Sequence, residues 1–205
     1  VHAAAPCPVD LKRQMLDWWG PIIHEYYSAT ELAGLTAIGP EEWLKKPGSV
    51  GRAVLGEPRI VGEDGSLLRP GEIGVIHFHG GPPFEYHRDP VKTASVTTDH
   101  GVTFGDVGYL DEDGYLFLTD RKNYMIISGG VNIYPQEAEN LLLMHPDVAD
   151  VAVFGIPDPD LGQIVKAVVQ PADWSKAGPE LERRLLDYAL SRLYRIKCPK
   201  SIDFD

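Results

Sequence analysis

The chain has 205 residues, of which 43% are apolar and 24% are charged, a composition typical of a globular protein. The formal net charge of -11 argues against a nucleic-acid partner, because phosphate backbones are bound by clustered Lys and Arg. No apolar run approaches the roughly 20 residues of a transmembrane helix, and the two distant cysteines give neither a disulfide framework nor a metal site. We expect a soluble protein of the reducing cytoplasm, whose oligomeric state the sequence leaves open.

The first part of the chain predicts a helix and then a strand. Apolar residues recur at mostly helical spacing over Val9–Trp19, and β-branched and aromatic residues favour a strand over Pro21–Tyr27. The polar loop Ser28–Glu31 follows that strand, which is a common place for a ligand. The tryptophans are expected to be packing residues, on the helix for Trp18 and Trp19 and in a loop for Trp43.

Between residues 48 and 119 the pattern changes to short alternating runs separated by turn residues. Such runs, for example Arg59–Val61 and Gly74–Phe78, favour a small sheet or a barrel-like subdomain. Asp111–Gly114 predicts a hairpin turn, because Asp-Gly accepts positive φ, with Tyr115–Leu118 as the returning strand.

A domain boundary is expected at residue 120, after which strands and helices alternate. The pattern predicts strands over 125–128, 148–154 and 164–169, a helix starting near Pro135, and a last helix over about 179–194. This β-α-β-β-α order describes a compact α+β lobe whose helices cover one face of the sheet.

The loop at residues 25–31 brings together groups that could hold a nucleotide. Tyr27 could stack on a purine, Thr30 could bond a phosphate oxygen, and Glu31 could hold Mg²⁺. The alternative is that the tyrosines are core aromatics and that Thr30 and Glu31 cap a following helix.

Two further stretches, Phe104–Tyr115 and Asp120–Pro135, carry a family resemblance together with Tyr27–Glu31. They resemble core motifs of the adenylate-forming superfamily of acyl-CoA synthetases, peptide-synthetase adenylation domains and luciferases. The tail Ile127–Glu137 is most similar to the AMP-forming acyl-CoA ligases of the fatty-acid-CoA ligase type, and 145–148 and 153–158 repeat that likeness.

The resemblance implies a two-step reaction. A carboxylate attacks the α-phosphate of ATP to give an acyl-adenylate and pyrophosphate, and the thiol of CoA then displaces AMP. It also implies the domain plan: the end of a large α/β subdomain (1–47), a barrel-like subdomain (48–119) and a mobile C-terminal lobe (120–205).

Motif by motif, the resemblance assigns roles to individual residues. Ala5, Pro6 and Tyr27 would border the adenine, Thr30 would meet the α-phosphate, and Glu31 would hold Mg²⁺. Asp106 would accept both ribose hydroxyls and Arg121 would donate on the ribose side. The plainer interpretation of Asp106 is a turn residue, and that of Arg121 is a surface cation at the end of a strand.

The resemblance also places a hinge and a CoA contact in the C-terminal lobe. The lobe would rotate about Asn123, where the family more often has Asp or Lys, and Gly129 and Gly130 would let CoA pass close to the backbone. The two glycines could equally form a turn with positive φ. Of the histidines, His2 and His24 lie near the presumed site and could border the substrate, and the others are interpreted as structural or surface residues.

No Gly/Ser/Thr-rich phosphate loop occurs in the chain, nor the family's final lysine motif, and both ends resemble cuts. We therefore expect a C-terminal part of an acyl-CoA ligase that is inactive by itself. The alternatives are an adenylation enzyme that loads a carrier protein, a luciferase-like oxygenase, and a non-catalytic nucleotide-binding protein. The acid substrate cannot be identified from these residues.

Overall fold

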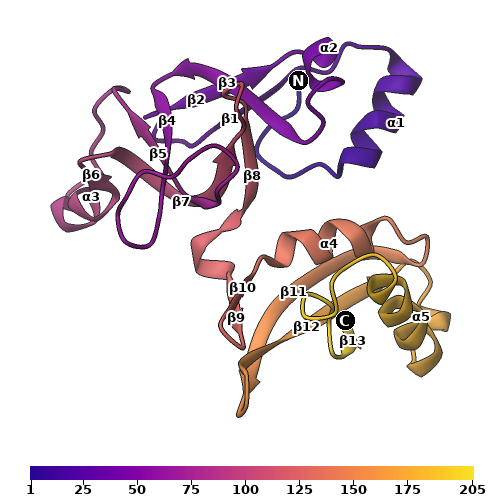
Figure 1. Cartoon of the computed structure of the whole chain (residues 1–205). Helices are drawn as coiled ribbons and strands as arrows, with labels where there is room; N and C mark the ends of the chain where they lie inside the picture. The colour runs from indigo at the N-terminus through magenta and orange to yellow at the C-terminus, as the bar shows by residue number, and fades with distance from the viewer. The chain divides into compact units, whose positions relative to one another are not determined.

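The computed structural model describes all 205 residues and consists of two compact units, Val1–Lys122 and Asn123–Asp205 (Figure 1). None of its helices combines the length and apolar character needed to cross a lipid bilayer. The three-part plan with boundaries at residues 47 and 119 stays a prediction.

One antiparallel sheet organises the first unit. Its strands run in the order β1-β2-β3-β8-β7-β5-β4, with β6 paired to β7. Their bounds are β1 Glu25–Ser28, β2 Leu35–Ile38, β3 Ser49–Leu55, β4 Glu57–Val61, β5 Gly74–His79, β6 Thr97–Thr98, β7 Gly101–Leu110 and β8 Leu116–Arg121. The sheet is open at β1 and β4, so the small sheet predicted from the alternating runs is present but no closed barrel forms.

Three helices accompany this sheet: α1 Val9–Trp19, α2 Pro40–Trp43 and α3 Pro90–Val96. The ends of α1 agree with the prediction, but its buried face does not. Trp18 is 78% exposed and stacks on the exposed Trp19, whereas Lys12 and Leu16, one turn apart, are buried. The interpretation of Trp18 and Trp19 as packing residues is therefore wrong, because the helix turns its Lys12 side toward the sheet. Trp43 is a packing residue as expected, but it lies in α2 rather than in a loop.

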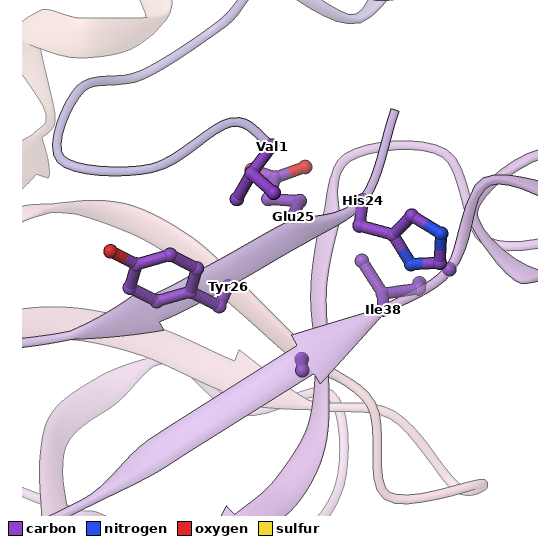
Figure 2. A pocket seen from close by; sticks show the side chains of 7 residues that line it. Val1, His24, Glu25, Tyr26 and Ile38 are labelled. Carbon is purple, nitrogen blue, oxygen red and sulfur yellow. The ribbon is translucent and has the colours of Figure 1, made fainter. Parts of the chain in front are cut away.

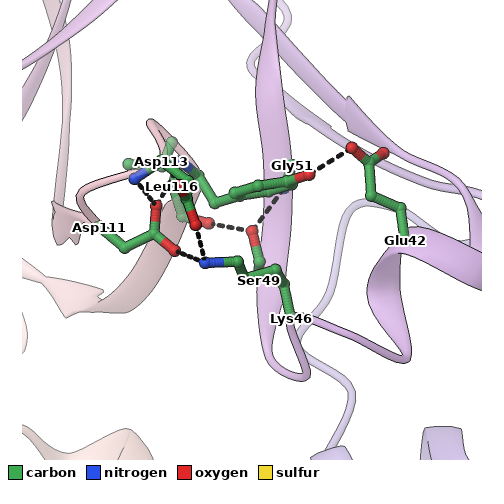
Figure 3. Close-up of polar contacts among 8 residues, drawn as sticks. Glu42, Lys46, Ser49, Gly51, Asp111, Asp113 and Leu116 are labelled. Atoms are coloured by element: carbon green, nitrogen blue, oxygen red, sulfur yellow. Dashed lines mark hydrogen bonds and ion pairs between the residues drawn. The ribbon is translucent and has the colours of Figure 1, made fainter.

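The predicted hairpin turn at Asp111–Gly114 joins β7 to β8, and polar contacts hold it to another segment of the same unit (Figure 3). Gly114 has φ of +79°, and Lys46 Nζ donates to Asp111 Oδ2 at 2.7 Å. The Ser49 hydroxyl donates to the Leu116 carbonyl at 2.9 Å, at the start of β8. These bonds connect the turn to Lys46 and the start of β8 to Ser49, the first residue of β3.

A β-bulge interrupts the pairing of β7 with β8. Val107 pairs with Asp120 and Gly108 with Leu118, so Thr119 is an extra residue in β8. Beyond the bulge, Asp106 pairs with Arg121.

The second unit combines helices and strands around one core. Its elements are β9 Ile126–Ser128, β10 Val131–Ile133, α4 Pro135–Leu143, β11 Val148–Asp158, β12 Gly162–Pro171, α5 Pro179–Leu190 and β13 Ile202–Phe204. The sheet order is β10-β9-β12-β11, with β13 parallel to β12. Alternate residues of β12, namely Val165, Ala167 and Val169, are buried with apolar residues of α4 and α5. The short strands β10 and β13 were not expected, because three residues are too few to show a period.

Candidate nucleotide site

Three side chains predicted to hold the nucleotide meet in the first unit. The Tyr27 hydroxyl on β1 donates to Asp106 Oδ2 on β7 at 2.6 Å. Arg121 Nε on β8 lies 3.3 Å from the other carboxylate oxygen, Asp106 Oδ1. The Asp106 side chain is 14% exposed and that of Arg121 is 65% exposed, so a nearly buried carboxylate faces a solvent-accessible cation.

Tyr27 stays protonated beside Asp106, and burial of the phenol is the main cause. Burial, followed by the negative charge of Asp106 and the hydrogen bond to it, raises the pKa of Tyr27 far above its usual range, while Arg121 opposes this shift. Tyr27 therefore remains a hydrogen-bond donor. Each carboxylate oxygen has about two lone-pair sites, so Asp106 can still accept bonds from two ligand hydroxyls while it holds Tyr27 and Arg121.

An aromatic cluster packs against the Tyr27 ring. The Tyr27 and Phe78 ring centroids are 6.1 Å apart, and Phe104 lies 6.0 Å from Phe78. Phe78 is buried, and a Cβ on Gly34 would lie 1.9 Å from its ring. Glycine at position 34 thus lets the loop after β1 lie directly on the ring that supports Tyr27.

The loop between β1 and β2 carries Thr30 and Glu31. The Ser28 hydroxyl donates to the Gly34 carbonyl at 2.7 Å, and the Leu32 N–H donates to the Ala29 carbonyl at 3.0 Å. The next element is strand β2, so the alternative that Thr30 and Glu31 cap a helix is wrong. Thr30 is exposed, and Glu31 accepts a hydrogen bond from the Tyr86 hydroxyl at 2.7 Å through Oε1.

Glu31 has the chemistry of a magnesium ligand. Its carboxylate is a hard oxygen donor, and Tyr86 bonds only one of its two oxygens. Mg²⁺ is usually bound through one or two carboxylates together with substrate phosphates. The role of Glu31 as its ligand stays a prediction.

Ala5 and Pro6 lie in an exposed turn just before α1. Their segment runs along β1, with His2 bridged to Glu25, and the His2 N–H donates to the His24 carbonyl at 2.8 Å. No hydrogen bond joins Ala5 or Pro6 to Tyr27, Asp106 or Arg121. Their predicted place at the adenine therefore stays a prediction.

One of the two histidines expected to border the substrate, His24, lies at a hollow of about 320 Å³ at the start of β1 and the end of β2 (Figure 2). His24 lines this hollow together with Tyr26 and Ile38, and the His2 side chain lies against Glu25. Of the other histidines, His77 on β5 is buried, and its burial lowers its pKa.

A buried ion pair beneath β1 was not expected. Lys12 of α1 is 1% exposed, and its Nζ bonds Glu25 Oε2 and lies 4.5 Å from the centroid of the Trp43 ring. His2 Nδ1 lies 3.3 Å from the other oxygen, Glu25 Oε1. Glu25 begins the strand that carries Tyr27, so the pair connects α1 to the site strand.

In the second unit, Gly129 and Gly130 form the turn between β9 and β10. Ser128 pairs with Val131 across it, and φ is +56° at Gly129 and +79° at Gly130. Positive φ at both central residues is what a two-residue type I′ hairpin requires. The turn interpretation of the glycines is confirmed, and their contact with CoA stays a prediction.

The predicted hinge residue Asn123 is the first residue of the second unit and lies in a short 3₁₀ turn, Lys122–Tyr124. It lines a hollow of about 220 Å³ with Phe154 and Gln163 of the same unit. Rotation about this residue stays a prediction.

Comparison with known proteins agrees with the motifs. Residues 137–204 match the AMP-binding enzyme C-terminal domain. The chain is 40% identical over 203 residues to a feruloyl-CoA synthase of Amycolatopsis sp, covering 98% of the chain and 40% of that enzyme. It is 40% identical over 183 residues to the indoleacetate--CoA ligase of Aromatoleum aromaticum, covering 88% of the chain and 35% of that ligase.

Solved structures of CoA synthetases also resemble this chain. The o-succinylbenzoate CoA synthetase of Bacillus subtilis in complex with the acyl-adenylate OSB-AMP matches with a TM-score of 0.89 and 31% identity, over 99% of this chain and 41% of that one. The same enzyme with ATP and magnesium ion matches with a TM-score of 0.85 and 29% identity, over 99% of this chain and 42% of that one. The chain thus spans about two fifths of the length of these relatives. Residues 137–204 thus belong to the AMP-binding enzyme C-terminal domain family, and the relatives of the chain in these comparisons are acyl-CoA ligases.

Proposed function

We propose that the chain is part of an ATP-dependent acyl-CoA ligase that activates a carboxylic acid as an acyl-adenylate and transfers the acyl group to CoA. The observation that carries the proposal is the contact of Tyr27, Asp106 and Arg121, which come from three strands and each match a nucleotide-binding motif. The ligase relatives support the acid and the thiol as the other substrates.

In the first step a carboxylate oxygen of the acid attacks the α-phosphorus of ATP, and the bond to the pyrophosphate oxygen breaks. Asp106 accepts the ribose hydroxyls, Arg121 donates on the ribose side, and Tyr27 lies against the adenine. Thr30 donates its hydroxyl to an α-phosphate oxygen. Glu31 would hold Mg²⁺, which would supply positive charge beside the phosphates. The protein groups act by position and charge rather than as nucleophiles.

In the second step the CoA thiol attacks the acyl carbonyl, loses its proton, and AMP leaves with the electron pair of the acyl–oxygen bond. The C-terminal lobe rotates about Asn123 between the steps, since one site must exclude water and then admit a bulky thiol. The tight Gly129–Gly130 turn presents backbone without side chains to CoA.

The function is tested on the reading frame extended at both ends, with ATP, Mg²⁺, CoA and a panel of fatty and aromatic acids. Formation of a CoA thioester, detected by mass spectrometry, supports the ligase and identifies its acid. Pyrophosphate release without thioester would instead indicate a carrier-loading or luciferase-like enzyme, and nucleotide binding without turnover a non-catalytic protein.

We expect residues 1–205 alone to release no pyrophosphate from ATP. No phosphate loop occurs among them, so the backbone N–H groups that would hold the triphosphate are absent. ATP-dependent pyrophosphate release by the purified 205-residue chain, with the extended protein measured alongside, would contradict this expectation.

The CoA contact is tested by Gly130→Asn. Asn tolerates positive φ, so the hairpin should keep most of its stability, while its side chain should raise the KM for CoA about tenfold, equivalent to ~1.4 kcal/mol. Adenylation, measured as acid-dependent ATP–pyrophosphate exchange, should stay within about twofold. Gly65→Asn, a turn glycine of the first unit with φ of +81° and open space around it, is the matched control. An unchanged KM for CoA would leave Gly130 with a turn role alone.

A further inference from the structure

Tyr86, in the segment between β5 and α3, contacts Glu31, the residue proposed to hold Mg²⁺. Tyr86 lies 55 residues from Glu31 in sequence, and its hydroxyl donates to Glu31 Oε1 at 2.7 Å. Both residues are half-buried in the first unit. No motif used in the sequence analysis includes Tyr86, and only the folded chain brings it to Glu31.

The backbone of Tyr86 is held independently of Glu31. Its N–H donates to the Thr93 hydroxyl oxygen at 3.0 Å, and its carbonyl accepts from the Asp89 N–H at 3.1 Å. Asp89 in turn caps α3, accepting from the Lys92 N–H at 2.9 Å. The backbone of Tyr86 is therefore held at the start of α3 by bonds that do not involve Glu31.

The Tyr86 ring is held as well. Phe84 meets it edge to face with centroids 5.3 Å apart, and Lys92 Nζ lies 4.1 Å from its centroid. A ring fixed by an aromatic neighbour and a cation has few orientations left for its hydroxyl. The hydroxyl is thus presented to Glu31 by groups that do not depend on the carboxylate.

The contact leaves the carboxylate able to bind a cation. Tyr86 engages Oε1, and Oε2 remains available for coordination. A ligand carboxylate that is itself hydrogen-bonded in this way is oriented before the metal arrives.

We propose that Tyr86 is a positioning residue for magnesium binding, which orients the Glu31 carboxylate toward the cation that accompanies ATP. This inference rests on the proposed function, because that function gives Glu31 its cation. Tyr86 itself touches neither the cation nor the reacting atoms.

The test compares ATP binding with Mg²⁺ and with EDTA by titration calorimetry, using the extended protein and its Tyr86→Phe variant. Loss of an outer hydrogen bond to a metal ligand costs roughly 10–100-fold in metal affinity. We expect Tyr86→Phe to raise the half-saturating Mg²⁺ concentration on the order of tenfold. Its ATP affinity in EDTA should stay within about twofold of the parent, a difference below ~0.4 kcal/mol.

Tyr194→Phe is the matched control, because Tyr194 is 80% exposed and lies in the other unit. A second arm uses the Glu31→Gln background, where Tyr86→Phe should have no further effect on the magnesium dependence. Circular dichroism checks that each variant is folded.

Unchanged magnesium dependence in Tyr86→Phe overturns the inference. Equal loss of ATP affinity with and without Mg²⁺ also overturns it, because a merely structural residue would act in that way. A parent protein that binds no ATP shows instead that the proposed function fails, and that result is seen before any variant is compared.

Discussion

Replacing Asp106 by Asn is expected to weaken ATP binding on the order of 100-fold, equivalent to ~2.7 kcal/mol. The carboxylate is nearly buried between the Tyr27 hydroxyl and Arg121, and its remaining lone pairs are the acceptors for the ribose. A hydrogen bond to a charged group contributes about 1.5–3 kcal/mol, and the amide of Asn removes both the charge and one acceptor oxygen. Titration calorimetry of ATP against the extended protein measures the change.

The control for this substitution is Asp99→Asn. Asp99 is an exposed aspartate in the turn between β6 and β7, and the same chemical change there should leave ATP affinity within about twofold, or ~0.4 kcal/mol. Tyr27→Phe, which removes one donor to Asp106 and keeps its charge, should give a smaller loss than Asp106→Asn. A folded Asp106→Asn variant with the ATP affinity of the parent would rule out the ribose role.

Replacing Lys12 by Met is expected to destabilise the first unit by about 3–5 kcal/mol, as found when one partner of a buried ion pair is removed. Met fills similar volume, so little of the loss should come from a cavity. The cost arises because Glu25, mostly buried at the start of β1, loses the cation that bonds its Oε2. Chemical denaturation measures the free energy of unfolding.

The double variant Lys12→Met with Glu25→Gln separates charge from packing. Removing both charges should recover most of the stability, because neutral replacements of a buried pair are often tolerated. Lys45→Met, in the turn that follows α2, where Lys45 is exposed, is the matched lysine control. A single Lys12→Met variant as stable as the parent would show that Glu25 finds compensation elsewhere, for example from His2.

The sequence was enough to predict an element or a site residue where the signal was local or carried by a motif. Helical spacing predicted both ends of α1, and the Asp-Gly turn predicted the β7–β8 hairpin. The motifs selected Tyr27, Asp106 and Arg121, which the fold brings into contact, and the family resemblance agrees with the comparisons. Their roles toward ATP stay predictions.

The sequence failed where a side chain depends on a distant partner. Periodicity gives a lysine no reason to be buried, so Lys12 became visible only with Glu25 and Trp43 around it. For the same reason the exposed Trp18 was misassigned, since hydrophobicity alone ranked it above Lys12. Tyr86 lies far along the chain from Glu31, and no spacing rule connects a loop tyrosine to a carboxylate from which four strands separate it in the sequence.

The extra residue Thr119 in β8 determines which charged residue pairs with Asp106 across the two strands. In an uninterrupted ladder that keeps Gly108 opposite Leu118, Asp106 would face Asp120, and two carboxylates directly opposite repel each other. The bulge shifts the strand by one position, so that Arg121 takes that place and Asp120 bonds the Arg121 N–H at 2.6 Å instead. A backbone irregularity, rather than any side chain, thus converts a repulsive pair into the attractive pair of the site.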